Sequence, residues 1–92
     1  MAQRRATVIY RGRVQGVGFR YTTRRAAARF AVTGTVKNLV NGSVELVAEG
    51  DEAEVRAFLA AVDEEHARNI REREIAWSDA TGGLGDTFRV AF

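Results

Sequence analysis

The chain has 92 residues, no cysteine, no proline and a formal net charge of +2. This length predicts a single domain over residues 1–92, long enough to bury a core without a metal or a disulfide. The lack of cysteine excludes thiol nucleophiles, disulfides and cysteine-type zinc sites. No apolar segment has the length of a signal peptide or a membrane span, so we expect a soluble, cytoplasmic protein.

Charge is distributed unevenly along the chain. All 12 acidic residues lie at or beyond Glu45, whereas most of the 14 basic residues precede it. The first half of the chain is therefore expected to attract anions. For most of its arginines, solvated side chains that pair with carboxylates of the second half are an equally good interpretation. The early basic residues are Arg4, Arg5, Arg11, Arg13, Arg20, Arg24, Arg25, Arg29 and Lys37.

The first predicted elements are a strand and a helix. Residues 6–13 alternate, with Ala6, Val8 and Tyr10 on one face, which predicts a strand with one buried side. Residues 21–31 carry a narrow, alanine-rich apolar stripe at helical spacing, which predicts an amphipathic helix suited to close packing on a sheet.

A hairpin and a second helix follow. Residues 35–40 and 43–49 alternate with period two on either side of the Asn-Gly pair at 41–42, which predicts a β-hairpin. Asp51 followed by Glu54 predicts a helix N-cap with a capping-box partner, and apolar residues then recur at helical spacing.

Two strands, over about 71–77 and over the last residues, are predicted to complete the chain, separated by a loop at 78–87. The order predicts an α+β fold of the ferredoxin-like βαββαβ type. We expect an antiparallel sheet with two helices packed on one face and a short extra C-terminal strand. Trp77, Phe88 and Phe92 are expected in the core.

Residues 12–20 (GRVQGVGFR) are the strongest candidate for a functional site. Gly16 and Gly18 permit backbone conformations in which consecutive N–H groups turn toward one point, and Arg20 adds a planar fork of donors. The helix that follows begins with basic rather than acidic residues, an arrangement that a bound anion would stabilise. The loop therefore predicts a site for a tetrahedral oxyanion such as phosphate. By contrast, the glycine-rich segment 81–85 leads into no predicted helix and is expected to be a flexible connection.

Two segments together resemble a known family. Residues 12–20, followed by Tyr21, resemble the signature of acylphosphatases. Residues 34–38 (GTVKN), followed by residues 41–45 (NGSVE), are similar to that family's second motif and have the right order and spacing. The resemblance covers most of the chain and is strongest up to about residue 60.

The resemblance implies which residues act. Arg20 would bind the substrate phosphate, and Asn38 would hold the attacking water. The remaining phosphate ligands would be the backbone N–H groups of Gln15, Gly16, Val17, Gly18 and Phe19. As an alternative, Asn38 could be a structural amide among the apolar residues of its strand.

The chain departs from the family's pattern in a few places. Thr35 stands where Trp is usual, and Lys37 stands where Arg is common. Residues 30–32 lack the glycine that commonly ends the first helix, so Ala31 would take a strained cap or the helix would end differently. The lone His66 has no partners at metal-ligand spacing and is expected to be solvated or to lie at a helix C-terminus.

The chemistry of an acyl phosphate is compatible with these residues. The leaving carboxylate has a conjugate acid with a pKa near ~4, so no general acid is needed. Phosphoryl transfer depends mainly on positioning and on electrostatic stabilisation, which Arg20 and the N–H groups can supply. A neutral amide such as Asn38 can orient a water without repelling an anionic substrate. Neither a metal nor another cofactor is implied.

Two other functions remain open from the sequence. One is an RNA-binding module of ferredoxin-like fold, although the aromatic residues near Arg20 lie at a helix start rather than on a central strand. The other is a non-catalytic phosphate or carbamoyl-phosphate binding domain, which resembles a segment of hydrogenase maturation proteins; Asn38 favours turnover. We expect an acylphosphatase that acts as a monomer on a small-molecule acyl phosphate, with no nucleic-acid or membrane partner.

Overall fold

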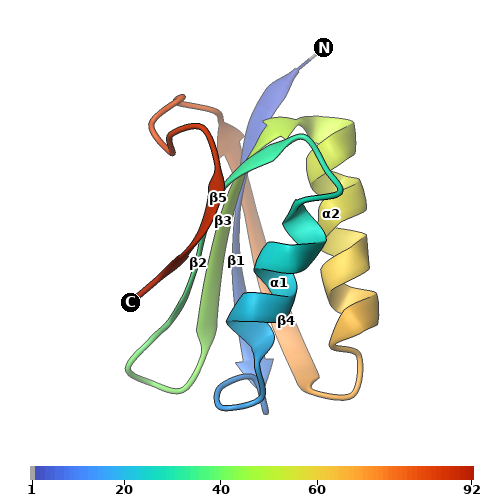
Figure 1. Ribbon diagram of the computed structural model, residues 1–92, viewed down its shortest axis with the longest axis vertical. Helices are drawn as coiled ribbons and strands as arrows, with labels where there is room; N and C mark the ends of the chain where they lie inside the picture. The colour runs from blue at the N-terminus through green and yellow to red at the C-terminus, as the bar shows by residue number, and fades with distance from the viewer. Residues whose placement is uncertain (1) are drawn as a thin grey trace.

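The computed structural model describes residues 2–92, which form a five-stranded sheet with both helices packed on one face (Figure 1). The strand order across the sheet is β4-β1-β3-β2-β5. None of the helices in residues 2–92 is long and apolar enough to cross a membrane. The elements in chain order are β1 (Gln3–Gly12), α1 (Phe19–Ala27), β2 (Val32–Asn38), β3 (Val44–Asp51), α2 (Glu52–Glu65), β4 (Ile70–Asp79) and β5 (Phe88–Ala91).

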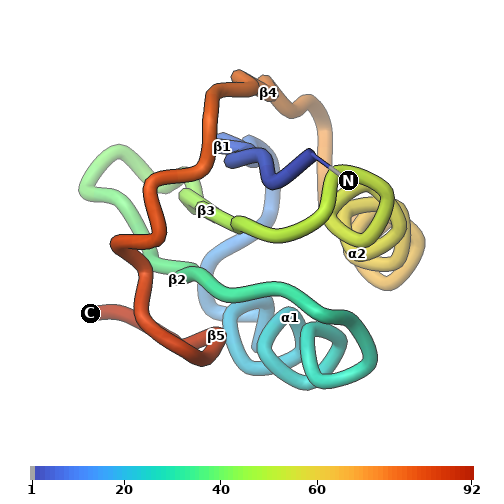
Figure 2. Tube along the Cα trace, turned by 90° about the horizontal axis from the view of Figure 1, so that it is seen from above, coloured from blue at the N-terminus to red at the C-terminus, as the bar shows by residue number. Residues whose placement is uncertain are grey.

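The expected ferredoxin-like arrangement is confirmed, but the sheet is mixed rather than wholly antiparallel. Strands β1 to β4 pair antiparallel, whereas β5 pairs parallel with β2, from Gly34 opposite Phe88 to Lys37 opposite Ala91. Strand β4 precedes β5 in the chain but lies at the opposite edge of the sheet (Figure 2). The antiparallel pairs from β4 across to β2 make β4 and β2 run in opposite directions. Because the chain reverses after β4 in the loop at 80–87, it enters β5 in the direction of β2.

The core lies between the sheet and the two helices. The inward face of β1 is fully buried at Ala6, Val8 and Tyr10, as its alternation predicts. Trp77 and Phe88 are partly buried and pack against the core. Phe92 is 93% exposed, so its predicted place in the core is wrong. The buried apolar side chains contributed by β3 and α2 are those of Val44, Leu46, Ala48, Val55, Phe58, Leu59 and Val62.

Helix α1 covers residues 19–27, two residues earlier and four residues shorter at its end than the predicted range 21–31. Its exit needs no strained residue, since within residues 2–92 only glycines have positive φ. The backbone N–H of Ala31 instead donates to Glu54 Oε1 at 2.9 Å. Asp51 is the N-cap residue of α2, as predicted, but its side chain makes no cap hydrogen bond. The predicted capping box is therefore wrong, because the Glu54 side chain accepts the Ala31 N–H instead.

The predicted hairpin joins β2 to β3, but its turn is longer than the Asn-Gly pair. Asn38 pairs with Val44, so the connection is the five residues 39–43. Asn41 Oδ1 accepts a hydrogen bond from the Ser43 N–H at 3.0 Å, and Gly42 has φ 92°. This wider turn places a loop beside the end of β2, where Asn38 lies.

The loop between β4 and β5 is anchored by a buried carboxylate. Glu49 is 4% exposed and accepts hydrogen bonds from the N–H groups of Thr81 and Gly82, each at 3.0 Å, and from Arg5 Nε at 2.6 Å. Burial alone raises the pKa of Glu49, but these hydrogen bonds outweigh it and hold the pKa below its ordinary value. The segment predicted as a flexible connection is thus tied to the sheet at its start.

Candidate active site

The loop from β1 to α1 gathers unpaired backbone donors at the start of the helix. Gly16 and Gly18 have φ values of 75° and 79°, in the left-handed region, and Gly18 is the N-cap of α1. Within residues 2–92, the N–H groups of residues 15–18 donate to no protein acceptor. The first N–H groups of α1 have no intrahelical partner either, and its first turn contains no acidic residue. This geometry suits an anion.

A small cavity brings the predicted residues together. It has a volume of about 100 Å³, roughly the space of three water molecules, and is large enough for a group the size of phosphate. Arg20 comes from α1 and Asn38 from the end of β2, so the fold places residues from separate elements on one cavity. Its lining residues are Val14, Gly16, Gly18, Phe19, Arg20, Tyr21 and Asn38.

Gln15 and Val17 belong to the loop but do not line the cavity. Val17 is 38% exposed. The side chain of Gln15 ties the loop to the β2–β3 turn, because its Nε2 donates to the carbonyl oxygens of Leu39 and Ser43, both at 2.8 Å. The sequence does not predict this contact, because its acceptors are backbone carbonyl oxygens, which every residue carries. It fixes the distance between the loop and the strand that carries Asn38.

The guanidinium of Arg20 contacts the end of β5 and the residue that follows it. Its Nη1 lies 3.4 Å from the carbonyl oxygen of Ala91, and its guanidinium carbon is 4.9 Å from the centroid of the Phe92 ring. The same guanidinium carbon is 5.9 Å from the centroid of the Tyr21 ring. Phe92 therefore contacts Arg20 instead of filling the core, and these contacts limit the freedom of the guanidinium beside the loop.

Asn38 is the last residue of β2 and is half-buried. Its neighbour on the same face, Val36, is fully buried, so the strand end is held firmly. Across residues 2–92 no protein group hydrogen-bonds to the Asn38 side chain. A structural amide would be satisfied by such partners. The Asn38 amide is thus available to a ligand or a water in the cavity.

His66 packs against the first turn of α1. Of the two placements predicted for it, solvated or at a helix C-terminus, the solvated one is wrong. It is the C-cap of α2, which agrees with the other placement, but it is only 5% exposed. Its ring stacks on Phe19 with centroids 3.9 Å apart, and its Nε2 lies 3.5 Å from Thr23 Oγ1. Burial lowers the pKa of His66, outweighing the nearby Glu65. No group of three metal-ligating side chains occurs in the described chain, His66 included.

The buried imidazole predicts a pH dependence of stability. The unfolded chain binds a proton at His66 below about pH 6.5, whereas the folded chain resists it, so the free energy of unfolding falls as the pH drops below that value. The contribution of His66 is at most about 1.4 kcal/mol per pH unit. Urea unfolding between pH 7.5 and 5.5 should show a steeper loss for the wild type than for His66→Phe or His66→Gln. Equal slopes in all three proteins would contradict the assignment.

Comparison with known proteins agrees with this geometry. The family model for acylphosphatase matches residues 6–90. An acylphosphatase of Paenarthrobacter aurescens is 44% identical over 94% of this chain and 92% of its own length, and one of Salinibacter ruber is 42% identical over 96% and 93%. The crystal structure of acylphosphatase from Bacillus subtilis superimposes with a TM-score of 0.85 at 31% identity, covering 97% of this chain and 99% of that one. The chain belongs to the acylphosphatase family and is an enzyme that hydrolyses acyl phosphates.

Proposed function

We propose that the enzyme cleaves the carboxyl–phosphate bond by direct attack of one water on the bound phosphate. Arg20 and the backbone N–H groups of residues 15–19 hold the phosphoryl oxygens, and Asn38 orients the water. The observation that carries the proposal is the shared cavity, onto which the glycine loop, the guanidinium and the amide converge.

The reaction needs no group that changes its protonation state. The P–O bond to the acyl group breaks, the electron pair leaves with the carboxylate, and both protons of the water leave with the phosphate product. Because the carboxylate is a weak base, with a conjugate-acid pKa near ~4, it departs without a general acid. The transition state spreads negative charge over the equatorial oxygens, where fixed N–H donors and the guanidinium stabilise it.

Phosphate release from benzoyl phosphate, with phenyl phosphate as a control, tests the function directly. We expect turnover of the mixed anhydride alone, because phenolate is a much poorer leaving group and the proposed residues include no acid to protonate it. We also expect full activity in EDTA and competitive inhibition by inorganic phosphate. Loss of activity on chelation that a divalent cation restores would overturn the metal-free mechanism.

We further propose that residues 1–92 act as one domain, as a cytoplasmic monomer without a nucleic-acid or membrane partner. Two observations support it. The chain contains no cysteine. Where β1 and β3 face away from the helices, they carry no aromatic side chain on which an RNA base could stack. Gel filtration and a single-stranded RNA titration test this proposal; a dimer or tight, sequence-selective RNA binding would contradict it. The outward residues compared are Arg5, Thr7, Ile9, Glu45, Val47 and Glu49.

A further inference from the structure

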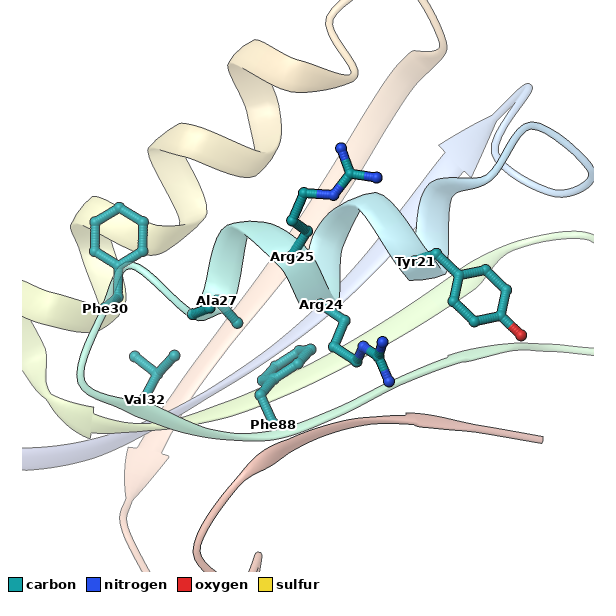
Figure 3. Close-up of a pocket in the computed structure, with 8 residues that line it drawn as sticks. Tyr21, Arg24, Arg25, Ala27, Phe30, Val32 and Phe88 are labelled. Carbon is teal, nitrogen blue, oxygen red and sulfur yellow. The ribbon is translucent and has the colours of Figure 1, made fainter.

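A surface groove adjoins the candidate active site. It has a volume of about 740 Å³ and lies between α1 and the strands β2 and β5 (Figure 3). Its walls include Tyr21 from α1, Val32 from β2 and Phe88 from β5. Tyr21 lines both this groove and the smaller phosphate-sized cavity, so the two spaces adjoin at this residue. A group attached to a phosphate in the cavity would have direct access to the groove.

Arg24 gives the groove a positive charge on the side of the cavity. It follows Arg20 by four residues in α1, and such residues are neighbours on a helix surface, with Cβ atoms about 5–6 Å apart. Helical side chains tilt toward the N-terminus, so Arg24 extends toward the turn that carries Arg20. In Figure 3 its guanidinium points from α1 toward β5, beside Phe88. Arg25 also lines the groove, but its guanidinium points the other way, toward α2.

No carboxylate neutralises Arg24. It is exposed, and the ion pairs found within residues 2–92 do not include it. The lining of the groove contains no acidic residue, and neither α1 nor β2 carries one. The groove therefore combines apolar and aromatic walls with two arginines, Arg24 and Arg25, that form no ion pair within residues 2–92.

We propose that this groove binds the acyl group of the substrate and that Arg24 binds a second anionic group on it. The inference rests on the proposed function, in which Arg20 holds the phosphoryl group. Arg20 and Arg24 are separated by about 6 Å along the helix axis, since each helical residue rises 1.5 Å. The preferred substrates are thus acyl phosphates whose acyl group is short and apolar or aromatic and ends in a carboxylate or a similar anion.

Two substrates of the same shape test this preference. One is 3-carboxybenzoyl phosphate, and the other is its neutral analogue, 3-carbamoylbenzoyl phosphate. The measured quantity is the ratio of kcat/KM for the charged to the neutral substrate, in which differences in phosphate binding cancel. Arg24→Gln is expected to lower this ratio by about two- to fivefold, the upper part of the range for an exposed ion pair. Raising the ionic strength should lower the wild-type ratio as well.

Arg68→Gln is the control, because it removes the same charge from an exposed residue that lines neither the groove nor the cavity. Its ratio should equal that of the wild type, and circular dichroism should show that both variants are folded. An unchanged ratio in Arg24→Gln, or an equal fall in both variants, would overturn the assignment of Arg24 while leaving hydrolysis itself intact. If the wild type hydrolysed none of these anhydrides, nor benzoyl phosphate, the proposed function would fail instead.

Discussion

Replacing Arg20 by alanine is expected to reduce kcat/KM for benzoyl phosphate by about 10³-fold or more, the scale on which a guanidinium stabilises a transferring phosphoryl group. Arg20 is the proposed charged ligand of the phosphate, and it lies on the cavity with the free N–H groups of the loop. Because the phosphate is bound before and after the transition state, inorganic phosphate should also bind more weakly, as isothermal titration calorimetry can measure.

Arg20→Lys separates the shape of the guanidinium from its charge. Lysine supplies a point charge, whereas arginine supplies a planar fork that can hold two phosphate oxygens at once, so the lysine variant should recover little activity. The Phe92 ring, 4.9 Å from the guanidinium carbon of Arg20, also favours arginine, whose planar group can stack on an aromatic ring. Arg68→Ala, which removes an exposed arginine that lines neither the cavity nor the groove, is the control and should remain close to wild type. If Arg20→Lys kept near-normal kcat/KM, the fork would be unnecessary, and Arg24 and Arg13 would be tested next.

The elements that the sequence predicts well are those whose signal is local. Alternation in β1 identified its buried face, and the apolar residues of α2 identified its packed side. The order of these elements was then enough to predict the ferredoxin-like fold. The glycine loop was equally visible, because Gly16 and Gly18 require backbone conformations that other residues avoid.

The features that the sequence missed depend on partners far along the chain. Periodicity shows which face of a strand is buried but not which strand lies beside it, so the parallel pairing of β5 with β2 was not visible. His66 is buried because the ring of Phe19, 47 residues earlier, stacks on it. Glu54 has the spacing of a capping-box residue, yet its carboxylate accepts a hydrogen bond from the Ala31 N–H instead. In each case a tertiary contact outweighed a local preference.

The candidate site shows the same division. The resemblance to acylphosphatases named Arg20 and Asn38, and the structure places both on one cavity. The contacts that hold them in place were not predicted. Gln15 reaches two carbonyl oxygens in the β2–β3 turn, and the support of Arg20 includes a carbonyl of β5. Carbonyl acceptors are common to all residues, so only the folded chain reveals which ones serve the site.

Asn38→Ala is expected to lower kcat by about 10²- to 10³-fold, the typical cost of losing one catalytic hydrogen-bonding group, while changing KM little. The reason is that the proposed partner of Asn38 is the attacking water and not the phosphate. Inorganic phosphate should therefore bind to this variant as it does to the wild type. Urea unfolding should show a small change in stability, since no protein group within residues 2–92 hydrogen-bonds to the side chain that is removed.

Asn38→Asp is the sharper variant of this experiment, because it keeps the shape of the side chain but replaces the NH₂ donor with a negative charge. The charge would lie beside an anionic substrate in a cavity of about 100 Å³, so KM should rise as kcat falls, and phosphate binding should weaken. Asn41→Ala controls for damage to the neighbouring turn, where Asn41 Oδ1 accepts the Ser43 N–H, and it should lose much less activity. If Asn38→Ala folded normally, bound phosphate normally and kept the wild-type kcat, the water would be oriented by another group. The N–H groups of Gly16 and Gly18 would then be the donors to examine, because both residues line the cavity and neither N–H donates to a protein acceptor within residues 2–92.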